Sequence, residues 1–457
     1  MFEAFWLPDR ERRVVQTLRH GATEFRYAAL EPNDVSAVCA SIRNAADRAR
    51  SISVRDRIDA IEIALDRVTD PRSSEYQYAV ELIPQIAGYS PEMVRAILDH
   101  MGMAWTRAAL ERLIESEVGD PMRLDQFVHD PKPGRRTMAF GPMLAAHIFS
   151  GNVPGVAVES LIRALLVKSA SFGKLAAEEP VLPILFTMAL PDALRDAIAL
   201  TYWPGGTDTL ENTLFQEADA IIVYGADQTV ESVRARAPSN RRIIVHGPRF
   251  SVGVVGDAAT QSSTIERTAA DVALAVALFD QQGCVSPHVV YVHGEYSTAR
   301  QFGNALSVQL ETVQQRLPRG RITPAEAMAE RDARARAEFN SIAGSEIELL
   351  SGPAHTVVTD ANAEFLPSCL NRFVYVKPFS AIQRLRNLLQ PVHQYLQSVA
   401  VTGFGEKQMA ELALELGHLG VTRITDFTQL PWPPLDWHHD GSRPLGELLR
   451  WVDWEGQ

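Results

Sequence analysis

The chain has 457 residues, of which 46% are hydrophobic and 22% are charged, which is the composition of an ordinary folded globular protein. This length favours two or three domains. The formal net charge of −12 argues against a general nucleic-acid binder, because such proteins carry a strongly basic face. The three cysteines, Cys39, Cys284 and Cys369, are too few and too scattered for a disulfide framework or a zinc site, and they favour a reducing, cytoplasmic compartment.

The sequence also argues against secretion and membrane insertion. The N-terminus lacks the basic start and apolar core of a signal peptide. No apolar run approaches the roughly 20 residues that are needed to span a bilayer. We therefore expect no membrane span.

Residues 1–135 are expected to form a mainly helical N-terminal region, in which Asp56–Val68 shows apolar residues at helical spacing. The proline- and glycine-containing segment Asp130–Gly134 is the expected boundary. Beyond it, short strands alternate with helices, which predicts βαβ units and a mostly parallel sheet. The expected strands are Thr137–Phe140, Ala220–Tyr224, Arg242–Val245 and Ser251–Val255, and the expected helices are Glu159–Lys168, Thr229–Arg236 and Thr264–Phe279.

A second α/β region follows in the C-terminal half of the chain. Its expected strands are His288–His293, Thr356–Thr359, Arg372–Val376 and Val399–Thr402, and Thr323–Phe339 is expected to be a solvated helix. The tail carries Trp432, Trp437, Trp451 and Trp454 among prolines and histidines. Tryptophans at that density are expected to pack on another surface rather than face water.

The segment Phe279–His288 is the most informative part of the chain, because it places Cys284 between an apolar helix end and a strand. A thiol among glutamine, glycine and serine has little to pack against and many backbone N–H groups around it. That setting suits a covalent nucleophile, because a thiolate forms readily and backbone amides stabilise an oxyanion. The alternative is a small buried cysteine in a helix-to-strand turn, since free cysteine is commonly buried.

Three other segments follow expected strands. In His147–Gly155, the side chain of Asn152 could direct its amide N–H at a developing negative charge, or it could serve only the turn. Phe172–Pro180 places Lys174 at a strand end, where it could bind a ribose or a phosphate or simply be solvated. Val223–Asp227 opens a helix whose N–H groups suit a pyrophosphate, although many such turns bind nothing. The Gly-x-Gly-x-x-Gly fingerprint of ordinary dinucleotide folds is absent.

In this order and spacing, the four segments resemble the aldehyde dehydrogenase superfamily. They resemble more closely its acyl-CoA reductase branch, the reductase of the bacterial bioluminescence fatty-acid reductase complex. The resemblance runs from about Arg136 to the C-terminus, and its best-matching pieces are Gly151–Gly155, Gln281–Pro287 and Trp432–Gly441. It implies an α/β fold with two Rossmann-like parallel-sheet domains, a helical N-terminal region and a small oligomerisation element. The implied parts are residues 1–135 (helical), 136–256 (nucleotide-binding), 257–425 (catalytic cysteine) and 426–457 (packing or oligomerisation tail).

The resemblance also implies roles for the catalytic residues. Cys284 is the expected nucleophile, and its backbone N–H and Asn152 are expected to form the oxyanion hole. The glutamate that activates water in hydrolytic aldehyde dehydrogenases has no counterpart in Ile243–Arg249, where His246 takes its approximate place. A reductase gains nothing from water activation, whereas a histidine can assist thiolate formation and protonate a departing group. The alternative for His246 is a buried histidine whose hydrogen bonds are satisfied at a strand end.

The cofactor site follows from the same resemblance. Lys174 is expected to contact the adenosine ribose, and Ser150 and Gly225 are further expected cofactor-binding positions. Many NAD-dependent members carry an acidic residue three positions after that lysine, but Ala177 stands there in this chain. The missing carboxylate leaves room for a 2′-phosphate, so the resemblance implies NADPH as the cofactor, with NADH as an alternative.

The adjacent residues His438, His439 and Asp440 suggest a metal site. Adjacent histidines on an extended segment point in opposite directions, however, which prevents both from binding one ion. We expect no metal there, and we expect these residues to stabilise the docking of the tail.

The leading hypothesis is NADPH-dependent reduction of a long-chain fatty acyl-CoA, or another acyl thioester, to the fatty aldehyde through an acyl-cysteine. A Cys-dependent acyltransferase without nucleotide is the main alternative, and a non-enzymatic scaffold is another. Ser171-x-x-Lys174 matches a serine-enzyme motif by chance, because its companion motifs are absent. The resemblance implies an acyl-protein synthetase subunit as partner and self-association into a homo-oligomer.

Overall fold

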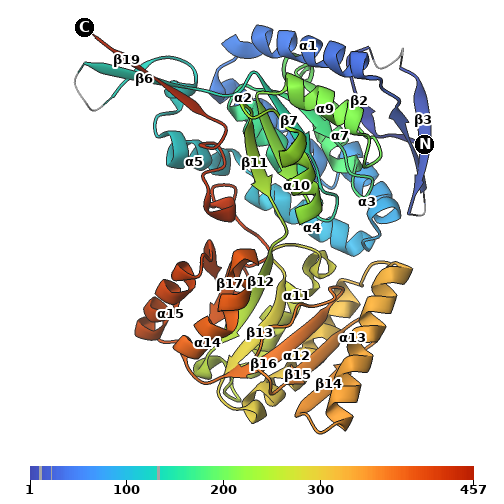
Figure 1. The fold of residues 1–457 in the computed structure, drawn as a ribbon, viewed down its shortest axis with the longest axis vertical. Helices are drawn as coiled ribbons and strands as arrows, with labels where there is room; N and C mark the ends of the chain where they lie inside the picture. The colour runs from blue at the N-terminus through green and yellow to red at the C-terminus, as the bar shows by residue number, and fades with distance from the viewer. Residues whose placement is uncertain (10–12, 22, 131–133, 457) are drawn as a thin grey trace. The chain divides into compact units, whose positions relative to one another are not determined.

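The computed structural model describes residues 1–9, 13–21, 23–130 and 134–456. The chain divides into two compact units. The first comprises Met1–Ala87, Val94–Gly247 and Pro434–Gln457, and the second comprises Gly88–Met93 and Pro248–Pro433. Figure 1 shows both units, with the blue-to-green elements and the red tail in the first. The units differ from the expected four-part division, whose proline-rich boundary at 131–133 lies outside the described residues.

The first unit is built on a six-stranded sheet of order β11-β10-β7-β8-β9-β2. Its strands are β2 (Phe5–Trp6), β7 (Leu144–Ile148), β8 (Ala170–Lys174), β9 (Ile198–Thr201), β10 (Ala220–Tyr224) and β11 (Arg242–His246). Strands β7 to β11 pair in parallel, and β2 joins the β9 edge antiparallel. The parallel strands are mostly apolar, as expected for strands with both faces covered.

The helices of this unit pack on the sheet or on one another. They are α1 (Pro32–Arg48), α2 (Val54–Thr69), α3 (Ser74–Ala87), α4 (Pro91–Ala104), α5 (Arg107–Val118), α6 (Val156–Leu166), α7 (Val181–Ala189), α8 (Asp192–Arg195), α9 (Asp208–Glu217) and α10 (Asp227–Arg236). Apolar residues of α1 such as Val38 and Ile42 share one core with Ala146 of β7 and Phe172 of β8. The apolar face of α1 is therefore buried against this sheet, and α2, α3 and α5 belong to the same unit.

A small N-terminal sheet was not expected in the mainly helical region. Its strands are β1 (Phe2–Glu3), β3 (Val15–His20) and β4 (Thr23–Ala28), in the order β1-β4-β3. β3 and β4 pair antiparallel on either side of Gly21, which has a φ of 60°. The signal for this hairpin was available in the sequence, since alternating segments rich in Val, Thr, Phe and Tyr flank a glycine.

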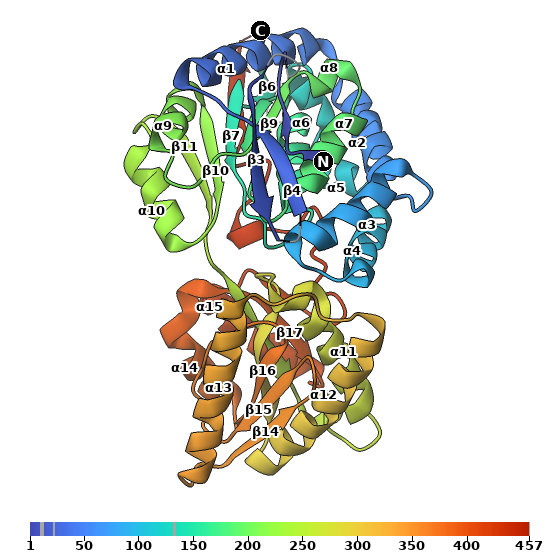
Figure 2. The same cartoon turned by 90° about the vertical axis from the view of Figure 1, so that its right-hand side faces the viewer.

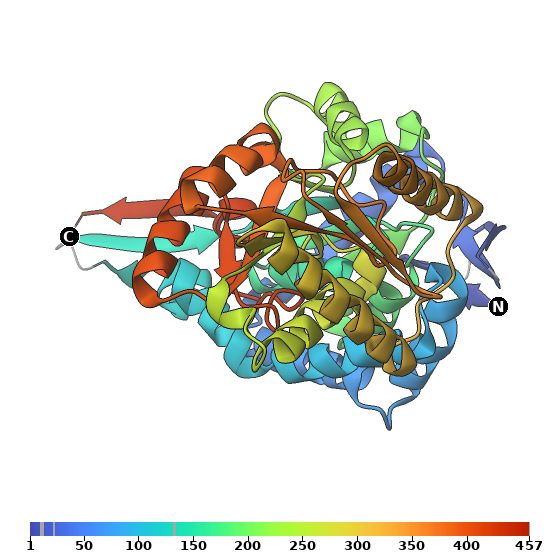
Figure 3. The ribbon, with the colours of Figure 1, turned by 90° about the horizontal axis from the view of Figure 1, so that it is seen from below.

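A second small sheet joins distant parts of the first unit. Its strands are β5 (Val128–His129), β6 (Arg135–Phe140) and β19 (Arg450–Glu455), all antiparallel in the order β19-β6-β5. Figure 3 shows the red C-terminal strand running beside the teal one. The expected strand Thr137–Phe140 therefore exists, but its placement in the parallel sheet was wrong. It instead forms an antiparallel ladder with the C-terminal strand.

The tail tryptophans follow the expectation only in part. Trp437 is 8% exposed, whereas Trp451 and Trp454 on β19 are 42% and 49% exposed. Arg123 and Arg136 lie over the Trp451 and Trp454 rings, at 6.0 and 5.0 Å from their centroids. The β19 sheet thus presents indole surface to the outside of its unit.

The second unit contains a seven-stranded sheet of order β14-β15-β16-β13-β12-β17-β18. Its strands are β12 (Phe250–Val255), β13 (Pro287–His293), β14 (Ile347–Ser351), β15 (Thr356–Asp360), β16 (Phe373–Phe379), β17 (Leu396–Thr402) and β18 (Arg423–Thr425). All neighbours pair in parallel except β14, which is antiparallel to β15. Their amino ends therefore meet at one edge of the sheet.

Two helical layers enclose this sheet, and each forms its own core. One layer contains α11 (Ile265–Ala277) and α12 (Tyr296–Arg316), and the other contains α13 (Pro324–Ile342), α14 (Ile382–Leu389) and α15 (Glu406–His418). Figure 2 shows these two groups on opposite sides of the sheet. Among the described residues, no helix combines the length and apolar character that crossing a bilayer requires.

Candidate functional site

Cys284 lies at the amino edge of the second sheet, in the loop before β13. Its side chain is half-buried, whereas Cys39 in α1 is fully buried. Its carbonyl oxygen accepts a hydrogen bond of 2.9 Å from Ser251 Oγ at the start of β12. The backbone N–H of Ser286 closes the loop on the Gly283 carbonyl, at 2.9 Å. The thiol is thus held on an ordered turn rather than sealed in an apolar core.

Two left-handed turns meet beside this loop: one lies just before it in the chain, and the other precedes β16. Phe279–Gln281 have φ values of 55°, 47° and 66°, and Leu370–Arg372 have values of 68°, 56° and 67°. None of these residues is glycine, so each adopts a strained backbone conformation that costs about 1–3 kcal/mol. The turns correct two expectations. The helix expected over Thr264–Phe279 ends at Ala277, and the strand expected from Arg372 begins at Phe373.

A buried ion pair joins the two turns. We call residues 279–281 and 370–372, with the bonds between them, the clasp. Arg372 donates from Nε and from a terminal nitrogen to Asp280 Oδ1, at 3.0 and 2.7 Å. The other Asp280 oxygen accepts the backbone N–H of Gly320, at 3.0 Å. The backbone N–H of Asn371 donates to the Asp280 carbonyl, at 3.1 Å.

The clasp also connects to the strands that carry the cysteine loop. The side-chain amide of Gln281 donates to the carbonyls of Pro287 in β13 and Phe373 in β16, at 2.8 and 2.9 Å. Gln281 is fully buried. Gln281 lies three residues before Cys284, and Pro287 lies three residues after it. The hydrogen bond between these two residues therefore restricts the conformations available to the loop.

We predict that Arg372→Met destabilises the protein, because it leaves the Asp280 carboxylate buried without its partner. Removing one member of a buried pair costs about 3–5 kcal/mol. Arg386→Met is the matched control, since Arg386 pairs with Glu415 at 2.8 Å on an exposed surface, where such a pair contributes about 1 kcal/mol or less. Urea unfolding followed by circular dichroism measures both, and equal losses of stability in the two variants would contradict the structural role of the clasp.

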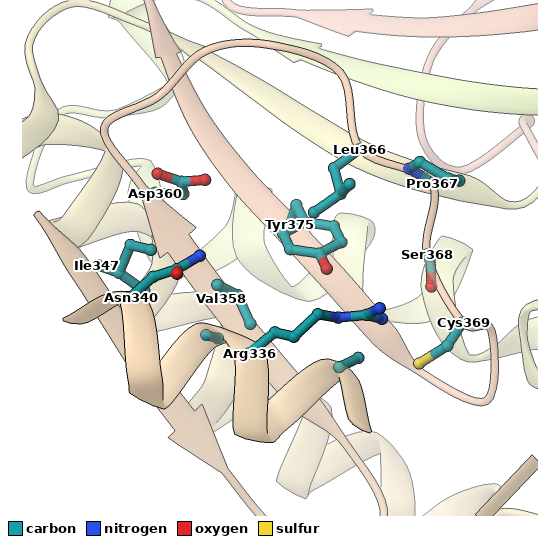
Figure 4. A pocket seen from close by; sticks show the side chains of 12 residues that line it. Arg336, Asn340, Ile347, Val358, Asp360, Leu366, Pro367, Ser368, Cys369 and Tyr375 are labelled. Carbon is teal, nitrogen blue, oxygen red and sulfur yellow. The ribbon is translucent and has the colours of Figure 1, made fainter. Parts of the chain in front are cut away.

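The third cysteine, Cys369, lies in a separate pocket of the second unit. The pocket has a volume of about 540 Å³ and lies between α13 and the strands β15 and β16. Figure 4 shows the Cys369 sulfur and the Arg336 side chain at this pocket. Burial raises the pKa of Cys369 to about 11, so this thiol is a poor nucleophile at neutral pH.

The carboxyl edge of the first sheet gathers the other expected site residues. The chain runs from β7 to β8 and β9 on one side and returns to β10 and β11 on the other, so the strand order reverses between β7 and β10. Ligands of open α/β sheets bind at such a switch point. Half-buried Ser150 and exposed Asn152 lie in the turn after β7, and Gly225 lies in the turn after β10. This geometry fits a bound nucleotide.

Lys174 ends β8 at the same edge, but it does not stand alone. Its Nζ donates to Glu211 of α9, at 2.7 Å, and Arg236 of α10 binds the other oxygen of that carboxylate. Burial alone would raise the pKa of Glu211, but its bonds to Lys174 and Arg236 outweigh this effect and lower it. Ala177, half-buried in the loop beyond Lys174, contributes no charge. Glu211 is therefore a carboxylate beside Lys174, although the sequence between Lys174 and Ala177 contains no acidic residue.

A buried carboxyl group lies in the same loop. Glu179 accepts the backbone N–H groups of Val181 and Leu182, at 3.0 and 2.8 Å, and so caps the first turn of α7. Burial raises its pKa from 4.5 to about 8, against the effect of these two bonds. The unfolded chain thus releases this proton at lower pH than the folded chain. Folding stability is therefore lost as the pH rises from about 4.5 to about 8.

We predict that Glu179→Gln removes this pH dependence, because the amide keeps an acceptor oxygen and has no proton to lose. Thermal unfolding midpoints between pH 5 and 9 measure the effect. At pH 8 the variant should be more stable than the wild type, by a free energy on the order of a few kcal/mol. A midpoint that falls with pH as steeply in the variant as in the wild type would show that the buried carboxyl is not responsible.

His246 ends β11 and pairs with the C-terminal tail. Its Nδ1 lies 2.8 Å from Asp440 Oδ2, and both side chains are only 9% exposed. Asp440 is a non-glycine residue with a φ of 54°. The His246 ring stacks between Tyr224 and His439, with centroid distances of 4.5 and 4.4 Å. The carboxylate on Nδ1 favours the tautomer in which Nε2 is the basic nitrogen.

His246, His439 and Asp440 also lie close enough together to be considered as metal ligands. The two imidazole rings, however, are stacked at an interplanar angle of 24°. A ligating nitrogen directs its lone pair in the plane of its own ring, so stacked rings direct theirs side by side and not at one ion. The arrangement suits a carboxylate-oriented histidine better than a chelate.

The structure thus brings the expected residues of the first unit to one sheet edge and places Cys284 at an edge of the second unit. The residues that share the first edge are Ser150, Asn152, Lys174, Ala177, Gly225 and His246. Sequence reasoning missed Glu211, the pairing of Asp440 with His246, and the clasp. Their partners lie tens to hundreds of residues away, and no short motif marks them.

The fold is that of the aldehyde dehydrogenases. A putative aldehyde dehydrogenase, PutA, from Anabaena variabilis matches with a TM-score of 0.73 and 17% identity over 97% of this chain and 98% of that one. A putative methylmalonate-semialdehyde dehydrogenase from Sinorhizobium meliloti, solved in complex with NAD, matches with a TM-score of 0.73 and 14% identity over 96% of this chain and 94% of that one.

The sequence comparison narrows the class. Residues 49–451 match the family described as acyl-CoA reductase (LuxC). The long-chain acyl-protein thioester reductase of Aliivibrio fischeri is 25% identical over 455 residues, which cover 94% of this chain and 90% of that protein. The chain belongs to the acyl-CoA reductase (LuxC) family, and it is therefore an oxidoreductase of the aldehyde dehydrogenase superfamily.

Proposed function

We propose that this protein reduces a long-chain acyl thioester to the fatty aldehyde through an acyl group carried on Cys284. The observation that carries the proposal is the half-exposed Cys284 on its ordered loop, in a chain of the acyl-CoA reductase (LuxC) family. The overall reaction converts the acyl thioester, NADPH and one proton into the aldehyde, the free thiol and NADP⁺.

The acyl donor is best taken as a thioester on a protein. The relative from Aliivibrio fischeri is named a long-chain acyl-protein thioester reductase, and its match covers nearly the whole of this chain. Acyl-CoA, the donor placed first on sequence grounds, serves in this proposal as the convenient assay substrate. An acyl-protein synthetase is the corresponding partner. A pull-down from the source cell that recovers no acyl-activating enzyme would count against it.

The residues of this chain perform the covalent steps. The Cys284 thiolate attacks the acyl carbonyl, and the first thiol leaves with its proton. The amide of Asn152 and the backbone N–H of Cys284 stabilise the oxyanion. His246, oriented by Asp440, moves the proton through Nε2. Collapse of the reduced adduct returns the Cys284 thiolate and frees the aldehyde.

NADPH is the proposed cofactor, with NADH as the alternative. When bound, it supplies the hydride that reduces the acyl carbonyl. The carboxyl edge of the first sheet would hold it through the turns that carry Ser150 and Gly225 and through the cluster of Lys174, Glu211 and Arg236. Lys174 and Arg236 both bind Glu211, and exposed Asp208 lies 3.2 Å from Arg236, so the formal charges of these four groups cancel. The preference for NADPH over NADH therefore rests on the family resemblance and not on this cluster.

We further propose a reducing, cytoplasmic location, because all three cysteines are free. Self-association is proposed through the β19 sheet, where exposed Trp451 and Trp454 leave indole surface uncovered within the unit.

We predict that Cys284→Ala abolishes aldehyde formation from a long-chain acyl-CoA, because no acyl-enzyme can form. Nucleotide binding, followed by fluorescence titration with NADPH, should stay within about twofold of the wild type. Turnover is measured by the fall in NADPH absorbance together with aldehyde analysis. Aldehyde production by the variant at the wild-type rate would refute the proposal. Acyl transfer by the wild type without any NADPH oxidation would favour the acyltransferase alternative.

We predict that Asn152→Ala slows the chemical step by about 100- to 1,000-fold, as expected for the loss of one oxyanion donor. The KM for NADPH should change little, because the proposed role concerns the acyl oxygen. Asn152→Asp is the companion variant, since it keeps the size and places negative charge beside the oxyanion. An unchanged kcat with a raised KM for NADPH would assign Asn152 to the nucleotide instead.

A further inference from the structure

Arg423 is a half-buried arginine at the amino end of β18, a short strand at the edge of the second sheet. Strands β12, β13, β17 and β18 run in parallel, so their first residues share the edge at which Cys284 lies. Arg423 therefore places a cation at the same sheet edge as Cys284, and no sequence motif marks it.

Two hydrogen bonds and a strand pairing connect Arg423 with the cysteine loop. Ser251 Oγ donates to the Cys284 carbonyl at 2.9 Å and accepts the backbone N–H of Ser398 at 3.3 Å. Ser398 in β17 lies directly across from Arg423 in β18. The interval from β12 to β18 is thus two strand spacings, about 10 Å.

The guanidinium is held in place by backbone carbonyls. Its two terminal nitrogens donate to the carbonyls of Leu430 and Gln429, at 2.9 and 2.6 Å. These carbonyls belong to the turn that follows β18. Both acceptors are neutral carbonyls, so they do not cancel the positive charge of the guanidinium. That charge can therefore act on neighbouring anions.

Cys284 is one of two groups whose negatively charged form interacts with the Arg423 charge. Burial lowers the pKa of Arg423 to about 10, while Asp426 and Cys284 act in the opposite direction. Asp426 is exposed, and its carboxylate also accepts bonds from Thr428 Oγ1 and the Gln429 N–H, at 2.6 and 2.9 Å. Solvent screens that interaction more than the one with the half-buried Cys284. A second carboxylate, Asp271 of α11, is close enough to Asp426 for the two negative charges to repel each other.

We propose that Arg423 is a positioning residue that holds the Cys284 sulfur as a thiolate through the charge of its guanidinium. This role rests on the proposed function, in which Cys284 is the nucleophile. The thiolate is needed twice, first to attack the acyl carbonyl and then as the leaving group when the aldehyde departs. A fixed cation beside the sulfur lowers the energy of the anion at both steps.

The test is the pH dependence of alkylation of Cys284 by iodoacetamide in the full-length protein without substrate, read by peptide mass spectrometry. Cys39 and Cys369 report separately, because burial raises their pKa values to about 12 and about 11. In the wild type, the midpoint should lie below about 8.5, the ordinary value for cysteine. Arg423→Met should raise the midpoint by about 1–3 units and slow alkylation at pH 7 about tenfold or more.

Arg423→Lys should keep most of the wild-type midpoint, because it keeps the charge and loses mainly the carbonyl bonds. Arg386→Met is the control, since Arg386 is exposed on α14 and pairs with Glu415. A purely structural Arg423 would lower the unfolding temperature in both Arg423 variants and leave the midpoint unchanged, which would overturn the proposal.

If Arg423→Met does not fold, Asp426→Asn decides the question. The amide keeps an acceptor for Thr428 and Gln429 and removes the competing negative charge, so the midpoint should fall. An unchanged midpoint would overturn the proposal. The outcomes also separate the two claims. A midpoint that depends on Arg423, in a protein that forms no acyl adduct and no aldehyde, would retain the thiolate role and refute the proposed reductase.

Discussion

The buried pair of Asp280 and Arg372 is the interaction on which the proposed catalytic loop of the second unit depends. It joins two turns of three residues each. None of these six residues is glycine, and all of them adopt positive φ values. Such turns store several kcal/mol of strain, and they persist only where surrounding bonds determine them. One of the two turns, 279–281, lies between the end of α11 and the loop that carries Cys284.

The two units contribute different chemistry through the same geometric rule. In the first sheet the strands end together, and the turns after β7, β10 and β11 bring an amide, a glycine turn and a histidine to one edge. In the second sheet the strands begin together, and this brings Cys284, Ser251 and Arg423 to one edge. Parallel strands are joined by long crossover connections, so residues at one edge of the sheet lie far apart in the chain.

Much of the fold could be predicted because buried parallel strands are continuous apolar segments. Ala220–Tyr224 has the predicted bounds, and the strands at 288–293 and 399–402 lie within the observed β13 and β17. The β3–β4 hairpin was missed because its strands carry arginine, glutamate and histidine on exposed faces. Arg372 was placed in a strand because nothing local reveals a left-handed backbone that a carboxylate 92 residues away holds in place.

The candidate site divides in the same way. Cys284, Asn152 and Lys174 could be named from the sequence because each stands in a short segment with a recognisable order. The pairing of Glu211 with Lys174 and the pairing of Asp440 with His246 could not be predicted, since the fold brings these partners together. Glu211 also adds a carboxylate beside Lys174 that the loop sequence around Ala177 does not reveal.

The central claim is that Cys284 carries the acyl group. The most direct measurement is to mix the protein with a long-chain acyl-CoA in the absence of nucleotide, quench in acid and map the peptides by mass spectrometry. The account predicts one acyl adduct, on the peptide containing Cys284, which disappears when NADPH is added before the quench. An adduct confined to Cys369 or Cys39, or aldehyde formed with no adduct on Cys284, would contradict it.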